Sequence, residues 1–494
     1  MISRKLQRAR DFENKYGPAA ARELPRFHVT GRVGWINDPN GFAPYQGEYH
    51  LFYQYHPYDT KWGPMHWGHV KTKDFIRWER LPVALAPDTD YDKDGCFSGG
   101  AVELPDGRHL LMYTGVKNSR RRDGRIESRQ TQCIAIGDGV NYEKYPGNPV
   151  IDSRALPQGG SPADFRDPHI WRENGVYRAV AVNRTQDGSG AVLLYESEDA
   201  LHWRFVSTLA ASRNQYGRMW ECPDFFSLNG TDVLIVAPQE VQAVGLEFHP
   251  GNANMAMLGH LDRQTNQLVP EAVQALDYGL DFYAPQSLLT ADGRRVMIGW
   301  MQNWETCGCH LPDQRFMGMM TIPRELTIRN GRLCQNPVRE LERYRANRVV
   351  YRQVTVQGDM ALQSVQGRYL DLTVNLAVTP EFRWFQMTLA GDGTHYTALR
   401  YCPASGLLRL DRTYSGLPCD IVNIREFAVR PRDGKLKLRL ILDRYSVELF
   451  VNDGEQAASA VIYTPLEAAA IRFSCDGTAV MDVEKYDILE EEQA

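Results

Sequence analysis

The chain has 494 residues, 43% of them hydrophobic, and a formal net charge of -5 at pH 7. This length predicts two domains with folded cores, and the charge gives no basic footprint for nucleic acid. No apolar run reaches about 18 residues, which excludes a membrane-spanning helix. Nine scattered cysteines form an odd count, which predicts reduced thiols and a cytoplasmic protein.

Residues 1–24 predict a helical extension. Residues 1–17 are rich in charged side chains and lack the apolar segment of a signal peptide. We expect a short helix here that stops at Gly17-Pro18, since glycine and proline punctuate helix ends.

Residues 25–332 contain a polar motif five times, each time followed by a Gly-containing turn and an apolar strand. The motifs begin at Asp38, Ser98, Asp167, Glu221 and Tyr283. The strands that follow span residues 49–55, 109–114, 176–182, 233–237 and 296–300. Regular repetition of a hairpin is typical of a β-propeller, so five repeats predict five blades of four strands. Three acids, Asp38, Asp167 and Glu221, would then face one axis from three different blades.

Residues 333–345 predict a linker with a short helix, and residues 346–494 predict a β-sandwich. Segments 369–378 and 436–442 alternate as strands do, and strand 447–451 ends in the hairpin turn Asn452-Asp453-Gly454. The predicted fold class is therefore all-β: a five-bladed β-propeller followed by a C-terminal β-sandwich. The second domain has no acid-rich motif, so we expect it to cover propeller surface, and it could pair subunits in a homodimer.

Each of the three acids has an ordinary structural explanation when it is taken alone. Asp38 opens the sequence Asp-Pro-Asn-Gly, which forms turns on many surfaces. Asp167 follows Arg166 and could close a loop, and Glu221 stands between residue types that are usually buried, where a carboxylate needs partners or a raised pKa. These explanations become weaker together, because each acid is expected at the same position of a repeated hairpin.

Three convergent carboxylates suit chemistry on a sugar. One could attack an anomeric carbon or activate water, and a second with a raised pKa could protonate the leaving oxygen. Aromatic and amide residues that suit a sugar lie near the acids in sequence: Trp35, Asn37, Phe52, Tyr53, Gln54, Trp62, Trp67, Phe97, Trp220, Tyr283 and Trp300. There is no Walker or dinucleotide motif, and Cys307-Gly308-Cys309-His310 lacks the second ligand pair of a zinc site, so we expect neither metal nor cofactor.

Several motifs resemble those of glycoside hydrolase family 32, the β-fructofuranosidases. The first is Trp35-Ile36-Asn37-Asp38-Pro39-Asn40-Gly41, and the match continues through Gln54 and residues 62–69, 97–99, 166–168, 220–223, 281–286, 323–326 and 443–448. These motifs cover most of the chain in order. The resemblance implies a five-bladed propeller with a β-sandwich, in agreement with the repeat count.

The resemblance also implies roles for individual residues. Asp38 matches the nucleophile, Glu221 the general acid/base, and Asp167 the acid that holds fructose hydroxyls and stabilises the transition state. The residues that match the lining of the fructose subsite are Trp35, Asn37, Gln54, Trp62, Phe97, Ser98, Arg166, Tyr283 and Trp300. Segments 116–129 and 306–315 match less well, and we expect them to shape the leaving-group side.

We therefore expect a retaining, exo-acting enzyme that removes terminal β-D-fructofuranosyl residues, primarily from sucrose. Sucrose 6-phosphate and short fructans are alternative substrates, and a fructosyltransferase would differ only in its acceptor. A non-catalytic sugar-binding propeller would have lost at least one acid, whereas all three are present. The basic segment Arg120-Arg121-Arg122 could face a phosphate, although a solvated run of charge is the commoner explanation.

Overall fold

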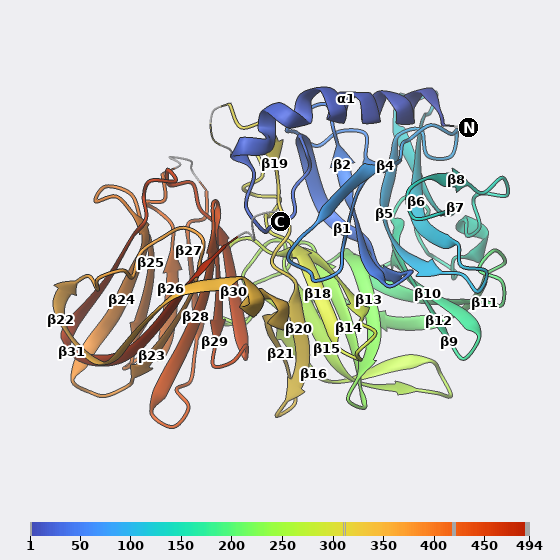
Figure 1. The fold of residues 1–494 in the computed structure, drawn as a ribbon. Helices are drawn as coiled ribbons and strands as arrows, with labels where there is room; N and C mark the ends of the chain where they lie inside the picture. The colour runs from blue at the N-terminus through green and yellow to red at the C-terminus, as the bar shows by residue number, and fades with distance from the viewer. Residues whose placement is uncertain (1, 310, 312, 417–420, 490–494) are drawn as a thin grey trace.

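The computed structural model describes residues 2–309, 311, 313–416 and 421–489. It consists of a five-bladed β-propeller and a C-terminal β-sandwich that lie side by side (Figure 1), as the sequence predicts. Among the described residues, no helix is long and apolar enough to cross a membrane.

Each propeller blade is an antiparallel sheet of four strands in chain order. Blade one contains β1 (Gly34–Tyr45), β2 (Glu48–His56), β3 (His66–Thr72) and β4 (Glu79–Leu85), with the short β19 (Phe316–Met317) parallel to β1. Blade two contains β5 (Gly95–Glu103), β6 (His109–Arg120), β7 (Ile126–Gly137) and β8 (Tyr142–Lys144). Blade three contains β9 (Phe165–Glu173), β10 (Val176–Arg184), β11 (Gly190–Ser197) and β12 (Arg204–Ala211).

Blades four and five complete the ring. Blade four contains β13 (Trp220–Leu228), β14 (Thr231–Pro238), β15 (Met255–Asp262) and β16 (Gln267–Ala275). Blade five contains β17 (Tyr283–Leu289), β18 (Arg295–Trp300), β20 (Arg324–Arg329) and β21 (Arg332–Pro337). The first strands β1, β5, β9, β13 and β17 contact one another around the ring, so they are the innermost strands. The five apolar strands predicted from the repeats are β2, β6, β10, β14 and β18, while the fifth blade extends to Pro337, beyond the expected boundary at residue 332.

Every innermost strand carries a β-bulge at the repeated motif. The pairing register shifts between Ile36 and Pro39 in β1, and at the corresponding motif in β5, β9, β13 and β17. Asp167, Cys222 and Ala284, each followed by proline, have positive φ angles of 60°, 47° and 49°. Innermost strands tolerate these prolines because they are edge strands, and bulges re-aim side chains away from the regular alternation. The bulges therefore turn the motif side chains toward the axis.

The N-terminal helix α1 (Arg4–Ala20) is longer than predicted, because it continues through Gly17 and Pro18. The expectation that the helix stops there is wrong. Proline in the last turn removes only one backbone hydrogen bond, and packing supplies more stability than propensity does. The helix buries one face against the propeller, formed by Leu6, Ala9, Arg10, Glu13, Gly17 and Ala20.

The linker predicted as a short helix contains the 3-10 helix η3 (Arg339–Tyr344), and the sandwich follows it. Its strands are β22 (Arg345–Met360), β23 (Leu370–Ala377), β24 (Phe382–Gly391), β25 (Thr397–Cys402), β26 (Leu407–Asp411), β27 (Ile424–Ala428), β28 (Lys435–Asp443), β29 (Ser446–Val451), β30 (Gln456–Val461) and β31 (Ala470–Ile488). The first half of β31 pairs with β24 and its second half with β23, so this strand connects the two layers. The predicted turn at residues 452–454 has positive φ at all three positions.

Buried charges connect the two domains. His28 of the segment that precedes β1 lies between two sandwich carboxylates, with Nδ1 2.8 Å from Asp443 Oδ2 and Nε2 2.8 Å from Glu448 Oε1. Arg324 contacts Glu448 from β20 and also lies 3.0 Å from Asp277. The side chains of all five residues are fully buried, so the interface depends on complete pairing of these charges.

Candidate active site

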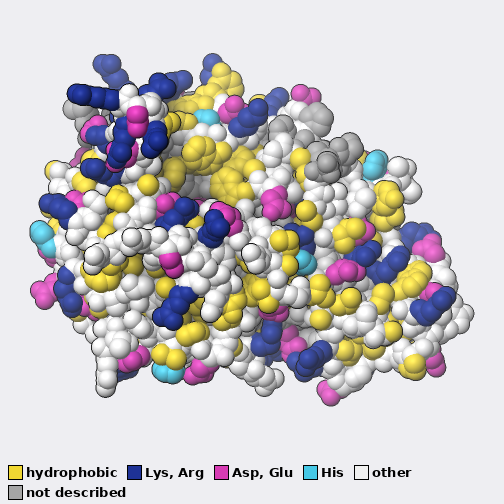
Figure 2. Space-filling view, turned by 180° about the vertical axis from the view of Figure 1, so that it is seen from behind, with side chains coloured by type: hydrophobic (Ala, Val, Ile, Leu, Met, Phe, Trp, Pro, Cys, Tyr) yellow, Lys and Arg dark blue, Asp and Glu magenta, His cyan; other side chains and the backbone are white. Residues whose placement is uncertain are grey.

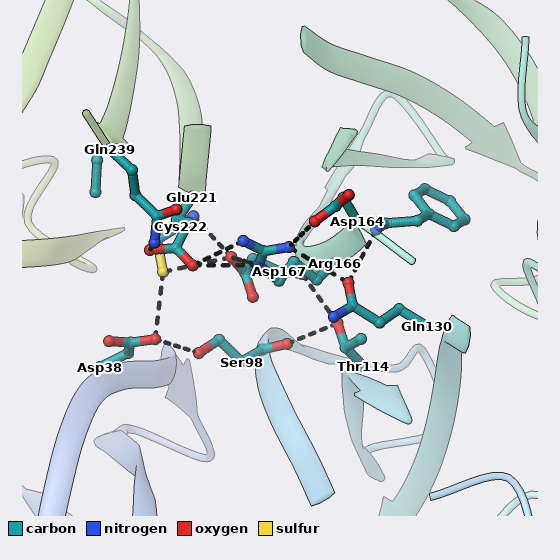
Figure 3. Close-up of polar contacts among 12 residues, drawn as sticks. Asp38, Ser98, Thr114, Gln130, Asp164, Arg166, Asp167, Glu221, Cys222 and Gln239 are labelled. Carbon is teal, nitrogen blue, oxygen red and sulfur yellow. Dashed lines mark hydrogen bonds and ion pairs between the residues drawn. The ribbon is translucent and has the colours of Figure 1, made fainter. Parts of the chain in front are cut away.

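The three predicted acids lie together at the propeller axis. Asp38 comes from the bulge of β1 and Asp167 from the bulge of β9, whereas Glu221 stands at the start of the bulge in β13. Figure 3 shows these side chains pointing toward one another from separate blades. Figure 2 shows a hollow in the face opposite to that of Figure 1, with hydrophobic side chains on its border.

Asp38 is held through one carboxylate oxygen. The Ser98 hydroxyl donates to its Oδ2 at 2.6 Å, and the Cys222 thiol lies 3.6 Å from the same oxygen. The other oxygen, Oδ1, is buried and has no hydrogen-bond partner among the described residues. Gln54 Nε2 donates to Ser98 Oγ at 3.0 Å, which orients the hydroxyl toward Asp38. Oδ2 of Asp38 is thus fixed by hydrogen bonds, while the buried Oδ1 lacks a hydrogen bond from the described residues.

Glu221 has hydrogen-bond donors on both oxygens. Arg166 donates to Oε1 from Nη2 at 2.9 Å and from Nε at 3.2 Å. Tyr283 donates its hydroxyl to Oε2 at 2.6 Å, and Gln239 donates Nε2 to the same oxygen at 2.8 Å. These partners come from blades three, four and five, so the position of Glu221 depends on the closed ring.

Asp167 is tied to its neighbours through backbone groups. Its Oδ2 accepts the Cys222 N–H at 3.0 Å, and its own N–H donates to Thr114 Oγ1 at 2.9 Å. The Nε atom of Arg166 lies 3.8 Å from Asp167 Oδ2, and Gln130 accepts a hydrogen bond from Arg166 Nη1 at 3.4 Å. The backbone of Cys222 therefore holds Asp167, and its thiol faces Asp38.

Burial and mutual repulsion raise the pKa values of this group. The pKa of Asp38 is raised first by burial and then by the charge of Glu221, against hydrogen bonds from Ser98 and Asn37 that lower it. The pKa of Asp167 is also raised by burial and by the other two acids, although Arg166 opposes this effect. Burial raises the pKa of the Cys222 thiol well above its usual value, so this side chain is a neutral donor. Carboxyl groups with shifted pKa values in one pocket are typical of acid/base and nucleophilic sites.

Aromatic side chains surround the acids. Trp35 and Trp300 are buried with ring centroids 5.8 Å apart, and Trp35 donates Nε1 to Asn37 Oδ1 at 2.7 Å. Trp62 is 49% exposed and meets Phe97 edge to face at 6.0 Å. Among the described residues, Trp300 Nε1 and Gln54 Oε1 are buried without hydrogen-bond partners, as is Asp38 Oδ1. Apolar faces with a few unpaired polar atoms suit a sugar ligand.

The contacts connect most of the sequence-predicted residues. Asn37, Gln54, Ser98, Arg166 and Tyr283 join the three acids through hydrogen bonds or electrostatic contact. Trp35, Trp300, Phe97 and Trp62 form the aromatic contacts. Among the described residues, every side chain that forms a hydrogen bond or ion pair with one of the three acids belongs to the propeller.

Five residues of this site were missed by the sequence analysis as functional: Thr114, Gln130, Cys222, Gln239 and Trp304. Gln239 lies two residues after the strand predicted at residues 233–237, which follows the Glu221 motif. Its place at the end of the strand paired with that motif could have identified it. Thr114 lies in β6 and Gln130 in β7, the second and third strands of blade two, where no motif marks them. Trp304 lies in the segment between β18 and β19, and its ring stacks on that of Trp35 with the centroids 6.0 Å apart.

The sequence offered one weak candidate for a metal site, formed by Cys307, Cys309 and His310, and predicted that it binds no metal. His310 lies outside the described residues. In the described part of the chain, no group of three or more His, Cys, Asp or Glu side chains is arranged to hold a metal ion. The side chains gathered around the axis are carboxylates, an arginine and hydroxyl groups.

Fold and site together define a glycoside hydrolase built on a five-bladed propeller. Comparison with known families agrees: residues 28–337 match the model for the glycosyl hydrolases family 32 N-terminal domain, and residues 340–490 match the family 32 C-terminal model. The chain belongs to glycosyl hydrolase family 32.

Similar proteins extend over nearly the whole chain. A sucrose-6-phosphate hydrolase of Zymomonas mobilis is 38% identical over 507 residues, covering 97% of this chain and 94% of the relative. A raffinose invertase of Escherichia coli is 36% identical and covers 92% of this chain and 93% of the relative. A solved structure of a Bombyx mori β-fructofuranosidase is 33% identical with a TM-score of 0.84, covering 99% of both chains.

Proposed function

We propose that the protein is a retaining, exo-acting β-fructofuranosidase that releases fructose from sucrose. The observation that carries this proposal is the convergence of Asp38, Asp167 and Glu221 among buried polar atoms that lack protein partners. Aromatic walls next to this group suit the apolar faces of a sugar ring.

The proposed reaction has two steps. Asp38 attacks C2 of the fructosyl unit with a carboxylate oxygen, while Glu221 gives its proton to the glycosidic oxygen and glucose departs. In the second step a water molecule gives a proton to Glu221 and attacks C2, which breaks the bond to Asp38 and releases fructose. Two inversions at C2 give overall retention.

Asp167 and Arg166 support the transition state in this proposal. Positive charge develops at C2 as the leaving oxygen departs, and a nearby carboxylate stabilises that charge. Asp167 would also accept hydrogen bonds from fructose hydroxyls. Arg166 contacts Glu221 and lies beside Asp167, so it orients both acids.

Sucrose 6-phosphate is a second candidate substrate. The relative from Zymomonas mobilis is called a sucrose-6-phosphate hydrolase, and a relative from Bacillus subtilis with the same name is 33% identical over 97% of this chain. The propeller site is the same for both substrates, so the choice depends on residues outside the fructose subsite.

We also propose that the protein works in the cytoplasm without a metal or an organic cofactor. All eight cysteines among the described residues are free thiols, which suits a reducing compartment. A homodimer remains a prediction of the sequence, to be tested by the mass of the protein in solution.

The test is an assay of purified protein on sucrose, sucrose 6-phosphate, raffinose and a short fructan, with released fructose and glucose measured separately. Sucrose should give equal amounts of fructose and glucose, and sucrose 6-phosphate should give equal amounts of fructose and glucose 6-phosphate. We expect this result with at least one of these two substrates. Asp38→Ala and Glu221→Ala should remove this activity while the protein remains folded by circular dichroism. Undiminished hydrolysis in the Asp38→Ala variant would refute the assignment of the nucleophile.

A further inference from the structure

A long hairpin projects from the wall of the proposed active site. Strands β6 and β7 pair continuously from His109 with Gly137 to Arg120 with Ile126. Thr114 on β6 accepts the N–H of Asp167, and Gln130 on β7 accepts hydrogen bonds from Arg166 and from the N–H of Phe165. Beyond these anchors the same two strands continue outward as residues 117–129, which we call the basic arm.

The basic arm carries an excess of positive charge. It contains six Lys or Arg residues and two acids, whereas the whole chain has a net charge of -5. Figure 2 shows Lys and Arg side chains gathered at the corner of the molecule that carries the N-terminus and blade two. Such a concentration of positive charge attracts anionic ligands.

Half of these cations are neutralised by neighbours. Lys117 pairs with Asp90, Arg121 pairs with Glu127 at 2.9 Å, and Arg125 lies 3.7 Å from Asp123. The other three cations, Arg120, Arg122 and Arg129, are exposed and form no ion pair with any other described residue. The charge available to a ligand therefore comes from these three side chains.

Strand geometry separates the three free cations. Side chains alternate between the two faces of a strand, and directly paired residues share a face. Arg120 is six residues from Thr114 and is paired with Ile126, which is four residues from Gln130. Arg120 therefore lies on the same face as the two side chains that contact Asp167 and Arg166.

Arg129 and Lys117 lie on the opposite face, which looks toward blade one. The ion pair of Lys117 with Asp90, in the segment between β4 and β5, shows the direction of this face. Arg122 belongs to the turn at the tip, where Gly124 N–H donates to Arg121 O. Arg120 is thus the free cation that shares a face with the acid-anchoring residues.

We propose that Arg120 is a specificity-determining residue that binds the 6-phosphate of sucrose 6-phosphate when the fructosyl unit occupies the site of the three acids. This inference rests on the proposed function. Arg120 lies about 14 Å along the strand from the Val116–Gln130 pair. Its long side chain can extend back over part of that distance, toward the leaving group of the substrate. A guanidinium matches a phosphate through two parallel hydrogen bonds, which sucrose itself cannot supply.

The experiment compares kcat/KM for sucrose 6-phosphate with kcat/KM for sucrose in the wild type, Arg120→Gln and Arg129→Gln. The matched control, Arg129→Gln, removes a free cation of the same arm from the opposite face. We expect the wild type to prefer sucrose 6-phosphate, Arg120→Gln to lower this preference about tenfold or more, and Arg129→Gln to change it less than twofold. Added salt should reduce the wild-type preference, because exposed charges are screened.

Competitive inhibition by the products gives a second readout. Glucose 6-phosphate should inhibit the wild type at least about tenfold more strongly than glucose does, and Arg120→Gln should remove most of that difference. Equal loss of preference in both variants would overturn the inference in favour of a general charge effect. Cleavage of sucrose with no preference for its 6-phosphate would overturn this inference alone, whereas failure to cleave either sugar would overturn the proposed function.

Discussion

His28 should stabilise the contact between propeller and sandwich in a pH-dependent manner. Burial alone would lower the pKa of this imidazole, but hydrogen bonds and charge from Asp443 and Glu448 raise it to about 9 from an ordinary value of 6.5. The folded protein therefore binds a proton that the unfolded chain releases between these two values. The stabilisation is fully present below about pH 6.5 and is lost as the pH rises through about 9.

The size of this effect follows from the pKa shift. A rise from 6.5 to about 9 corresponds to about 3 kcal/mol of the free energy of unfolding. All three side chains are fully buried, so solvent screens the interaction little. Loss of the positive charge on His28 would leave the carboxylates of Asp443 and Glu448 close together without the cation between them. Arg324 would still balance the charge of Glu448 but not that of Asp443.

The assay is urea unfolding of the wild type and of His28→Gln at about pH 6.5 and about pH 10. We expect the wild type to lose about 3 kcal/mol more than the variant between the two values. His202→Gln is the matched control, because His202 lies 2.7 Å from Asp199 but its side chain is 84% exposed. This control should follow the wild type within about 0.5 kcal/mol.

An identical pH dependence in wild type and His28→Gln would refute the reasoning. Should the variant not fold, the wild type alone still provides a test. Its unfolding midpoint, followed by tryptophan fluorescence, should then fall between about pH 6.5 and about pH 9 and level off above it, and a constant midpoint over that range would contradict the account.

The remaining predictions concern the acids. Glu221→Gln should lower kcat/KM on sucrose by about 10²-fold or more. The rate of the first step with an activated aryl fructoside should fall far less, since a good leaving group needs no proton. Equal losses on both substrates would count against the acid role. Asp167→Asn should lower kcat by on the order of 100-fold with little change in the free energy of unfolding, because its contacts strengthen mainly in the transition state; an unfolded variant would instead indicate a structural clamp with Arg166. A crystal structure should place the carboxyl groups of Asp38 and Glu221 about 5 to 5.5 Å apart, and a separation near 8 Å would favour inversion.

The overall fold could be predicted because the repeats are regular. Five motifs, each followed by a turn glycine and an apolar strand, correspond to five blades, and the acids of three motifs lie at the axis. The bulges could not be predicted from period alone, because a one-residue insertion looks like any other residue in the sequence. As a result, the three acids do not occupy equivalent positions: Asp38 and Asp167 are in bulges, and Glu221 precedes one.

Other features depend on contacts between distant segments. Helix α1 continues past Pro18 because its buried face packs on blade one, which local propensity does not record. Gln130 and Gln239 hold the acids from strands without a motif, and only the closed ring brings them near Arg166 and Glu221. His28 stands far from Asp443 in sequence, so nothing local predicted their pairing, although segments 323–326 and 443–448 belong to the family motifs.

The most direct test of the central claim is to identify the residue that becomes covalently attached to fructose. Glu221→Gln should be incubated with an activated aryl β-fructoside, digested and analysed by peptide mass spectrometry. The first step proceeds without an acid and the second step lacks its base, so the fructosyl-enzyme should accumulate. The account predicts one added fructosyl unit on the peptide that contains Asp38. Attachment to Asp167, or complete turnover to inverted fructose with no labelled peptide, would contradict it.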